Sequence, residues 1–171
     1  LAFTLNADGS FTYTPEANFN GVDTFNYRAF DGTAYSNVAM AQITVTNVND
    51  APVAQAQPVS TNQNTPIIIT LTASDIDSAT LSFNSAMPPS HGSLGITGAP
   101  NCTPVGQGAA CTANVSYTPA LNYFGPDSFT FTATDGLATS APATVSITVI
   151  QVNRPPSANA GGPYTGIVGV P

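Results

Sequence analysis

The residues of this chain best suited to chemistry are two carboxylates placed one residue apart. Asp75 and Asp77 follow a run of largely β-branched residues at positions 67–73. Carboxylates at this spacing can converge on one hard cation, and Ca²⁺ takes about six to eight oxygen ligands from side chains, carbonyls and water. Asp side chains also cap turns by accepting hydrogen bonds from nearby backbone N–H groups. The spacing alone leaves both interpretations open, a calcium site or a pair of turn caps.

Residues for covalent or acid–base catalysis are scarce. The single histidine, His91, lies in the turn-forming run Pro88-Pro89-Ser90-His91-Gly92. A nucleophilic relay needs a nucleophile, a histidine and a carboxylate within hydrogen-bond reach, and no nucleophile motif accompanies this histidine. Lysine is absent, which excludes a lysine Schiff base and a lysine–asparagine isopeptide cross-link within this sequence. We therefore expect no enzyme activity.

Two cysteines, Cys102 and Cys111, lie nine residues apart in a Gly-rich segment. A zinc site would need four ligands, and His91 is the one histidine available to join them. We therefore expect a Cys102–Cys111 disulfide, which is typical of proteins from an oxidising, extracellular compartment.

The charge of the chain limits its partners. Nine acidic residues oppose two basic residues, Arg28 and Arg154, and the formal net charge is −7. Such an acidic chain repels phosphate backbones and anionic membrane surfaces. The same charge favours solubility and cation binding. We expect no nucleic-acid partner and no membrane insertion.

Short β-strands must position these residues. Charged residues make up only 6% of the 171 positions and hydrophobic residues 42%, so the polar surface must consist of Thr, Ser, Asn and Gln, which suits strands better than helices. Fifteen Pro and 14 Gly indicate many turns. No window shows a convincing 3.6-residue apolar period. The composition predicts an all-β fold.

The chain contains a long internal repeat. Positions 11–54 align without a gap on positions 115–158, and 20 of the 44 aligned residues are identical. A fixed period of domain size indicates tandem modules rather than short solenoid turns. Between positions 51 and 154 we expect about seven short strands, the number typical of an immunoglobulin-like sandwich.

The repeated residues resemble a known family. They are His91-Gly92-Ser93-Leu94, Tyr117-Thr118-Pro119, Asn122, Gly125, Asp127, Phe129, Phe131, Asp135-Gly136 and Ile147-Thr148-Val149. This frame resembles the bacterial cadherin-like or Ig-like tandem repeats of secreted adhesins and surface proteins. The resemblance implies tandem Ig-like (cadherin-like) β-sandwich modules. Residues 155–171 resemble the start of a PKD-type repeat, another extracellular β-sandwich.

The resemblance also implies a division of the chain. Residues 1–50 correspond to the C-terminal part of one module, which we call the first module. Residues 51–154 correspond to a complete module, the second module. A module with half of its strands would expose an apolar face and open sheet edges. We expect either that the chain is a fragment or that another chain completes the first module.

A ligand set for calcium follows from the same resemblance. The segment Asn47-Val48-Asn49-Asp50 resembles the cadherin linker that supplies calcium ligands between modules. We expect Asn49, Asp50, Asp75 and Asp77 to gather there, with Asp31 or Glu16 as further ligands. Asp31-Gly32 and Asp135-Gly136 also suit hairpin turns. Arg154 replaces Asp50 in the second copy, so we expect no calcium at that junction.

The expected function is structural. We expect a non-enzymatic, extracellular stalk or fibre segment of an adhesin on the bacterial cell surface, stiffened by Ca²⁺. Its partners would be neighbouring repeats or subunits and a cell-surface or matrix ligand. One alternative is a subunit of a homopolymeric filament assembled by strand complementation between chains. Another is an accessory ligand-binding module of a secreted hydrolase.

Overall fold

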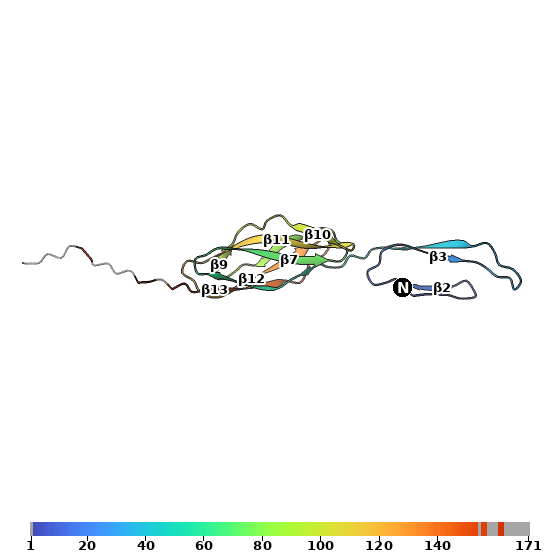
Figure 1. Cartoon of the computed structure of the whole chain (residues 1–171), viewed down its shortest axis with the longest axis horizontal. Helices are drawn as coiled ribbons and strands as arrows, with labels where there is room; N and C mark the ends of the chain where they lie inside the picture. The colour runs from blue at the N-terminus through green and yellow to red at the C-terminus, as the bar shows by residue number, and fades with distance from the viewer. Residues whose placement is uncertain (1, 154, 157–160, 163–171) are drawn as a thin grey trace, which may run out of the picture.

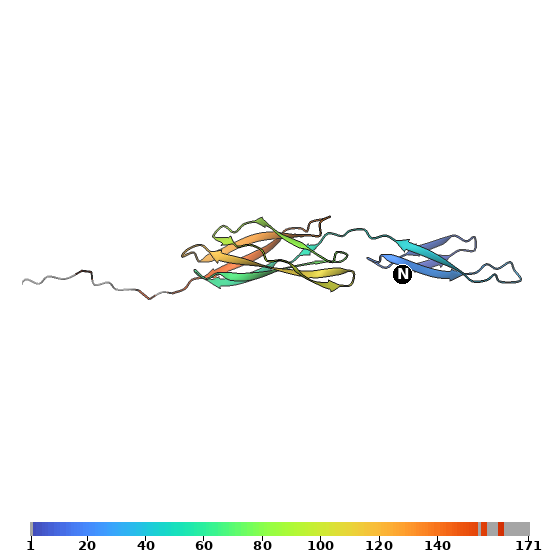
Figure 2. The same ribbon diagram turned by 90° about the horizontal axis from the view of Figure 1, so that it is seen from above.

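The computed structural model describes residues 2–153, 155–156 and 161–162, and the predicted start of a PKD-type repeat lies largely outside them. The described residues contain strands and turns and no helix, which confirms the predicted all-β fold class. The strands gather into two β bodies that follow one another along the long axis (Figures 1 and 2). None of the described residues forms a helix long and apolar enough to span a membrane.

The first body consists of two hairpins. One hairpin pairs β1 (Ala2–Leu5) with β2 (Phe11–Thr14), and the other pairs β3 (Gly21–Tyr27) with β4 (Ala39–Val45). Half-buried and exposed residues alternate along β4, so that every second side chain of its sequence AMAQITV lies on the half-buried face. Phe3, Phe11 and Phe25 meet between the hairpins, with ring centroids 4.4–6.0 Å apart.

The second body is a sandwich of two sheets. One sheet has the order β10-β11-β7-β5 with β9 also paired to β11, and the other has the order β6-β13-β12-β8. Neighbouring strands are antiparallel except β13 and β6, which run parallel. The strands are β5 (Val53–Ala54), β6 (Gln57–Asn62), β7 (Ile67–Asp75), β8 (Ser82–Met87), β9 (Gly92–Leu94), β10 (Asn101–Val105), β11 (Gly108–Pro119), β12 (Gly125–Thr134) and β13 (Ala143–Ile150).

The core of the second body follows from strict alternation. In β13 the sequence ATVSITVI buries every second residue, as expected of a strand with one face on the core. The largest fully buried side chains include Tyr117, Phe129 and Phe131. Burial of such aromatic side chains contributes about 1.5–3 kcal/mol each.

Repeated sequence gives repeated turns in the two bodies. In the turn after β3 the carboxylate of Asp31 accepts hydrogen bonds from two backbone N–H groups, and in the turn after β12 the carboxylate of Asp135 does the same. Gly32 and Gly136, which follow them, have φ values of 98° and 96°, a conformation that favours glycine. The two Asp-Gly pairs are therefore turn formers, as the sequence suggests.

The predicted disulfide is present. Cys102 and Cys111 are direct partners on β10 and β11, with Cα atoms 4.0 Å apart. The sequence suggests a loop here, whereas the structure shows a hairpin that turns through Gly106, whose φ is 61°. This hairpin is present only in the second body, between the counterparts of β1 and β2.

Candidate metal centre at the junction

The segment 46–52 links β4 to β5 and crosses the end of the sandwich where β7 and β12 finish. Two Asp side chains mark that end. Asp75 is the last residue of β7, and Asp135 follows β12. We call the six polar residues of this region the junction site: Asn47, Asn49, Asp50, Asp75, Asp77 and Asp135.

Asp75 is buried without complete hydrogen bonding. Its side chain is only 7% exposed. Its Oδ1 accepts hydrogen bonds from the backbone N–H groups of Asp77 and Ser78, each at 2.9 Å. Its Oδ2 is inaccessible to solvent and has no hydrogen-bond partner. A buried carboxylate oxygen of this kind is costly unless a proton or a cation satisfies it.

Asp77 connects the linker to the second body. Its Oδ2 accepts hydrogen bonds from Asn47 Nδ2 at 2.9 Å and from the backbone N–H of Asp50 at 3.2 Å. Its Oδ1 is buried and, like Asp75 Oδ2, has no hydrogen-bond partner. The two unpartnered oxygens belong to neighbouring side chains of one turn.

The two carboxyl groups perturb each other. Burial raises the pKa of Asp75 above its ordinary value of 3.8, and the adjacent Asp77 carboxyl raises it further. The pKa of Asp77 is lowered, first by a hydrogen bond from the Asp75 carboxyl and second by Asn47. Both shifts follow when one proton is shared by two close carboxyls. Without a cation, a proton shared between the two otherwise unpartnered oxygens would relieve the repulsion between these carboxyls.

Asp135 also accepts a hydrogen bond from the linker. Its Oδ2 accepts a hydrogen bond from Asn49 Nδ2 at 2.9 Å, while its Oδ1 is held by Leu137 and Ala138 N–H. The Ala138 hydrogen bond is the largest cause of the lowered pKa of Asp135, followed by that of Asn49. Asp135 therefore stays ionised and adds negative charge to the region of Asp77, where it opposes the lowering of the Asp77 pKa.

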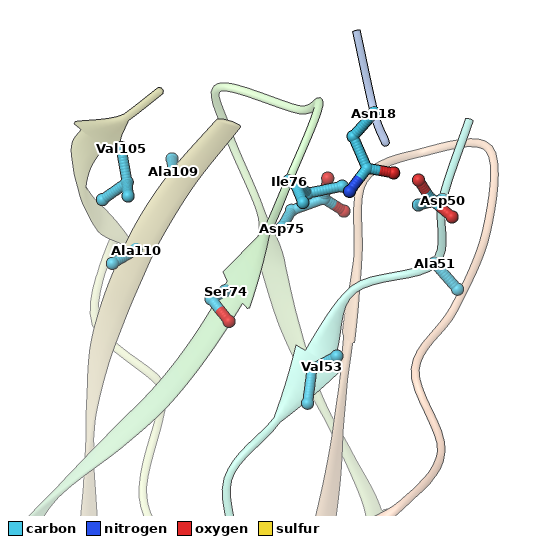
Figure 3. A pocket seen from close by; sticks show the side chains of 10 residues that line it. All are labelled: Asn18, Asp50, Ala51, Val53, Ser74, Asp75, Ile76, Val105, Ala109 and Ala110. Atoms are coloured by element: carbon cyan, nitrogen blue, oxygen red, sulfur yellow. The ribbon is translucent and has the colours of Figure 1, made fainter. Parts of the chain in front are cut away.

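A cavity of about 490 Å³ opens beside the carboxylates. Asp50 and Asp75 line it together with Asn18, which comes from the loop between β2 and β3 of the first body (Figure 3). Val105 and Ala109 of the disulfide-closed hairpin form part of the apolar wall. Both β bodies thus contribute polar side chains to the junction.

The residues present fit a hard cation. Two buried carboxylate oxygens, on Asp75 and Asp77, have no partner, and carboxylate oxygens are the ligands that Ca²⁺ prefers. Within the described part of the chain, no three His, Cys, Asp or Glu side chains already stand at metal-ligand spacing. Asn47 and Asn49 presently direct their NH₂ groups at carboxylates. They would have to rotate to offer oxygen to a metal.

Four of the six residues that the sequence suggested lie in the junction site: Asn49, Asp50, Asp75 and Asp77. Asp31 does not. It follows β3, at the end of the β3–β4 hairpin opposite to Val45 and the linker. Glu16 lies in the loop between β2 and β3. Arg154, expected to block a second calcium site, is outside the described residues.

Three contributors to the junction, Asn18, Asn47 and Asp135, are not among the ligands expected from the sequence. The repeat contains the signal for Asp135, because this residue is the counterpart of Asp31 one module later. A linker that follows the first module meets the Asp-Gly turn of the second module, not that of the first. For Asn18 we find no signal in the sequence that points to this junction.

Comparisons with known families agree with the two bodies. Residues 49–148 match the family model described as bacterial Ig domain, and residues 2–47 match the model described as bacterial cadherin-like domain. Integrin beta-like protein A of Dictyostelium discoideum is 36% identical over 120 residues, which cover 68% of this chain. The matched part is only 6% of that protein's length.

Two solved structures show a low level of similarity to this chain. The endo-fucoidan hydrolase MfFcnA4 of glycoside hydrolase family 107 has a TM-score of 0.44 and 18% identity, over 88% of this chain and 22% of that chain. PapD-like domain 7 of human CEP192 has a TM-score of 0.40 and 9% identity, over 64% of this chain and 92% of that chain. At this level of similarity, neither structure says anything about the activity of this chain.

Proposed function

The chain belongs to the bacterial Ig-domain family, with a bacterial cadherin-like segment ahead of the Ig domain, and on this premise we propose that it is a non-enzymatic stalk or fibre segment of a bacterial surface adhesin. Bacterial Ig and cadherin-like domains are typically extracellular modules without catalytic activity. The matched relative carries the name of an integrin-like protein, which supports a role in adhesion. The internal disulfide supports an oxidising location outside the cell.

We further propose that Ca²⁺ stiffens the junction between the modules. The observation that carries this proposal is the pair of buried, unpartnered oxygens on Asp75 and Asp77 beside the linker. Asp75, Asp77 and Asp50 would hold the ion. The nearby carboxylate of Asp135 would add electrostatic attraction. Ca²⁺ bound there would supply positive charge that replaces the shared proton.

The hydrogen bonds of the linker explain how a bound cation would stiffen the junction. Asn47, Asn49 and Asp50 of the linker already hydrogen-bond to two separate loops of the second module, at Asp77 and Asp135. In the metal-free molecule these bonds surround several repelling carboxylates. A divalent cation removes that repulsion, so the linker and both loops can act as one unit. A stalk needs this property because it must transmit orientation from module to module.

The composition suits an exposed stalk. The two basic residues, Arg28 and Arg154, leave few cleavage sites for trypsin-like proteases. The guanidinium of Arg28 also lies 3.8 Å from the centroid of the Tyr35 ring, a cation–π contact that occupies this side chain.

Titration of the full chain with Ca²⁺, with the heat of binding measured by calorimetry, tests the proposal. We expect binding by the parent chain and at least about tenfold weaker binding by Asp77→Asn, because the variant loses one ligand charge. Asp31→Asn is the control, since it removes the same charge from a turn that lies away from the junction. Equal affinity of Asp77→Asn and Asp31→Asn, or no binding to the parent chain, would rule out the calcium junction.

A further inference from the structure

The strand β3 has a free edge where its repeat counterpart has a partner. In the second body β12 pairs with β13 on one side and with β8 on the other. In the first body β3 pairs with β4 in the same way, and its second edge has no partner among the described residues. A free edge presents a row of unpaired N–H and C=O groups that can accept another strand.

The apolar side chains beside this edge are uncovered. Phe131 of β12 is fully buried at 0% exposure, with the ring of Phe83 of β8 at 6.1 Å. Its counterpart in β3, Tyr27, is 45% exposed. Likewise Val115 of β11 is 3% exposed, whereas its counterpart Phe11 is 47% exposed. A cavity of about 820 Å³, lined in part by Phe11 and Tyr27, lies in this face.

In the part of the chain that the structure describes, Asp23 lacks two hydrogen-bond donors that its counterpart in the second body, Asp127, has. Asp127 accepts hydrogen bonds from the Tyr117 hydroxyl, its neighbour Ser128 N–H, and the N–H groups of Ser90 and His91 in the turn after β8. Its counterpart Asp23 receives the first two kinds of bond, from the Tyr13 hydroxyl and the Thr24 N–H. No bond matching those of Ser90 and His91 is made to Asp23 within the described residues. Asp23 also lines a small apolar cavity with Tyr13.

We propose that the free edge of β3 binds a strand-and-turn segment of the β8 type, with the pattern of residues 82–91. Transfer of the register in the second body places the Phe83 position of the segment opposite Ala29 and the Ser85 position opposite Tyr27. The turn of the segment then supplies two N–H donors to Asp23. Binding of an extended segment to a sheet edge takes affinity from the main chain and specificity from such side-chain pockets.

The chemistry of the site favours a peptide segment over a small apolar ligand. An apolar molecule could cover Phe11 and Tyr27, but it would leave the N–H and C=O groups of the β3 edge and the acceptor positions of Asp23 without partners. A β8-type strand covers the apolar side chains, pairs with the backbone groups of the β3 edge and donates to Asp23. The segment 78–91 carries no Lys, Arg, Asp or Glu, so it meets no repulsion from the acidic chain.

A synthetic peptide of residues 78–91 added to the full chain tests this inference. We expect saturable binding, and slower hydrogen exchange at backbone amides of residues 21–27 with no change at residues 125–134, whose edge is already occupied by β8. The control peptide carries Leu81→Ser and Phe83→Ser at the same length. We expect it to bind at least about tenfold more weakly, because both side chains point to the core in the second body.

A second variant tests the contact at the carboxylate. Asp23→Ala in the full chain should weaken peptide binding at least about tenfold, because the segment loses two hydrogen bonds to a charged acceptor. Unchanged exchange at residues 21–27 with saturating peptide would overturn the inference. Equal binding of the control peptide would also overturn it, because the contact would then lack the side-chain pattern of β8. Neither result depends on calcium.

Discussion

Asp75 and Asp77 share one environment but are held differently. Asp75 is buried at the end of β7 and its pKa is raised, whereas Asp77 faces the linker and its pKa is lowered. The proton that relieves their repulsion occupies the place that a cation would take. Binding of Ca²⁺ must therefore compete with protonation of Asp75.

The first prediction concerns pH. Because the folded-state pKa of Asp75 is raised, the metal-free protein binds this proton more tightly than the unfolded chain does, so its stabilising effect is present below pH 3.8 and is lost as pH rises through the folded-state pKa. Ca²⁺ restores stability in the range where the proton is lost. The calcium-induced rise in Tm should be several degrees near pH 7 and vanish near pH 4.

The variant Asp75→Asn distinguishes the effect of the proton on Tm from the effect of the metal. Its amide can keep the bonds to Asp77 and Ser78 N–H and can donate to the Asp77 carboxylate, as protonated Asp75 does. We expect a metal-free Tm at pH 7 no lower than that of the parent chain, and no calcium-induced rise. A lower metal-free Tm together with a full calcium response would contradict the shared-proton account.

A second prediction at the residue scale compares two equivalent carboxylates. Asp127→Ala removes the acceptor of four hydrogen bonds and leaves the fully buried Tyr117 hydroxyl without a partner. Burial and the Asp127 carboxylate both raise the pKa of Tyr117, which therefore stays a neutral donor. We expect the free energy of local opening, measured by hydrogen exchange in residues 125–134, to fall by about 3–5 kcal/mol, because hydrogen bonds to a charged group are lost.

Asp23→Ala is the matched change in the first module. Asp23 accepts two hydrogen bonds, and its partner Tyr13 is only half-buried. We expect the free energy of local opening, measured by hydrogen exchange in residues 21–27, to fall by about 1 kcal/mol. Equal losses for both variants would show that the two extra backbone donors to Asp127 contribute nothing.

At the scale of elements, much of the fold could be predicted from the sequence. The Asp-Gly turns and the disulfide appear in the structure as expected, and the family matches confirm the cadherin-like and Ig-like resemblance. Buried or half-buried positions alternate with exposed ones along β4 and β13. The β10–β11 hairpin was missed because Pro104, Gly106 and Gly108 read as loop residues. Its pairing depends on β7, which lies more than 30 residues away in sequence and covers the other edge of β11.

The disulfide gives a prediction at this scale. It joins β10 to β11 through two cysteines that are nine positions apart in the sequence, so the loop it closes is short. The chain-entropy model assigns about 2–3 kcal/mol to a loop of this length. The double variant Cys102→Ala/Cys111→Ala should lower the free energy of unfolding by about that amount in a urea titration. A change below about 0.5 kcal/mol would mean that the hairpin needs no covalent closure.

The hairpin also connects to the junction, because Val105 and Ala109 line the cavity beside Asp50 and Asp75. The same double variant should therefore weaken calcium binding only slightly, since the hairpin supplies no carboxylate. A loss of calcium binding as large as that of Asp77→Asn would show instead that the hairpin holds the site in place.

At the scale of the whole molecule, the junction site required information that the sequence pattern lacks. Asn49 meets Asp135 across 86 positions, and Asn47 meets Asp77 across 30. Periodicity predicts strands and turns, but it does not say which turn of one module faces the linker of another. Alignment of the repeat supplies that step, because it equates Asp31 with Asp135 and assigns each Asp-Gly turn to the linker that precedes its own module.

On the proposed function, calcium fixes the two modules relative to each other. Spin labels at Thr12→Cys and Thr144→Cys, both on exposed strand positions in different modules, would report the inter-module distance by pulsed electron resonance. We predict one narrow distance distribution with Ca²⁺ and a broad one after addition of chelator, and a broad distribution under both conditions in the Asp77→Asn background. Distributions of equal width with and without Ca²⁺ in the parent chain would contradict a calcium-stiffened stalk.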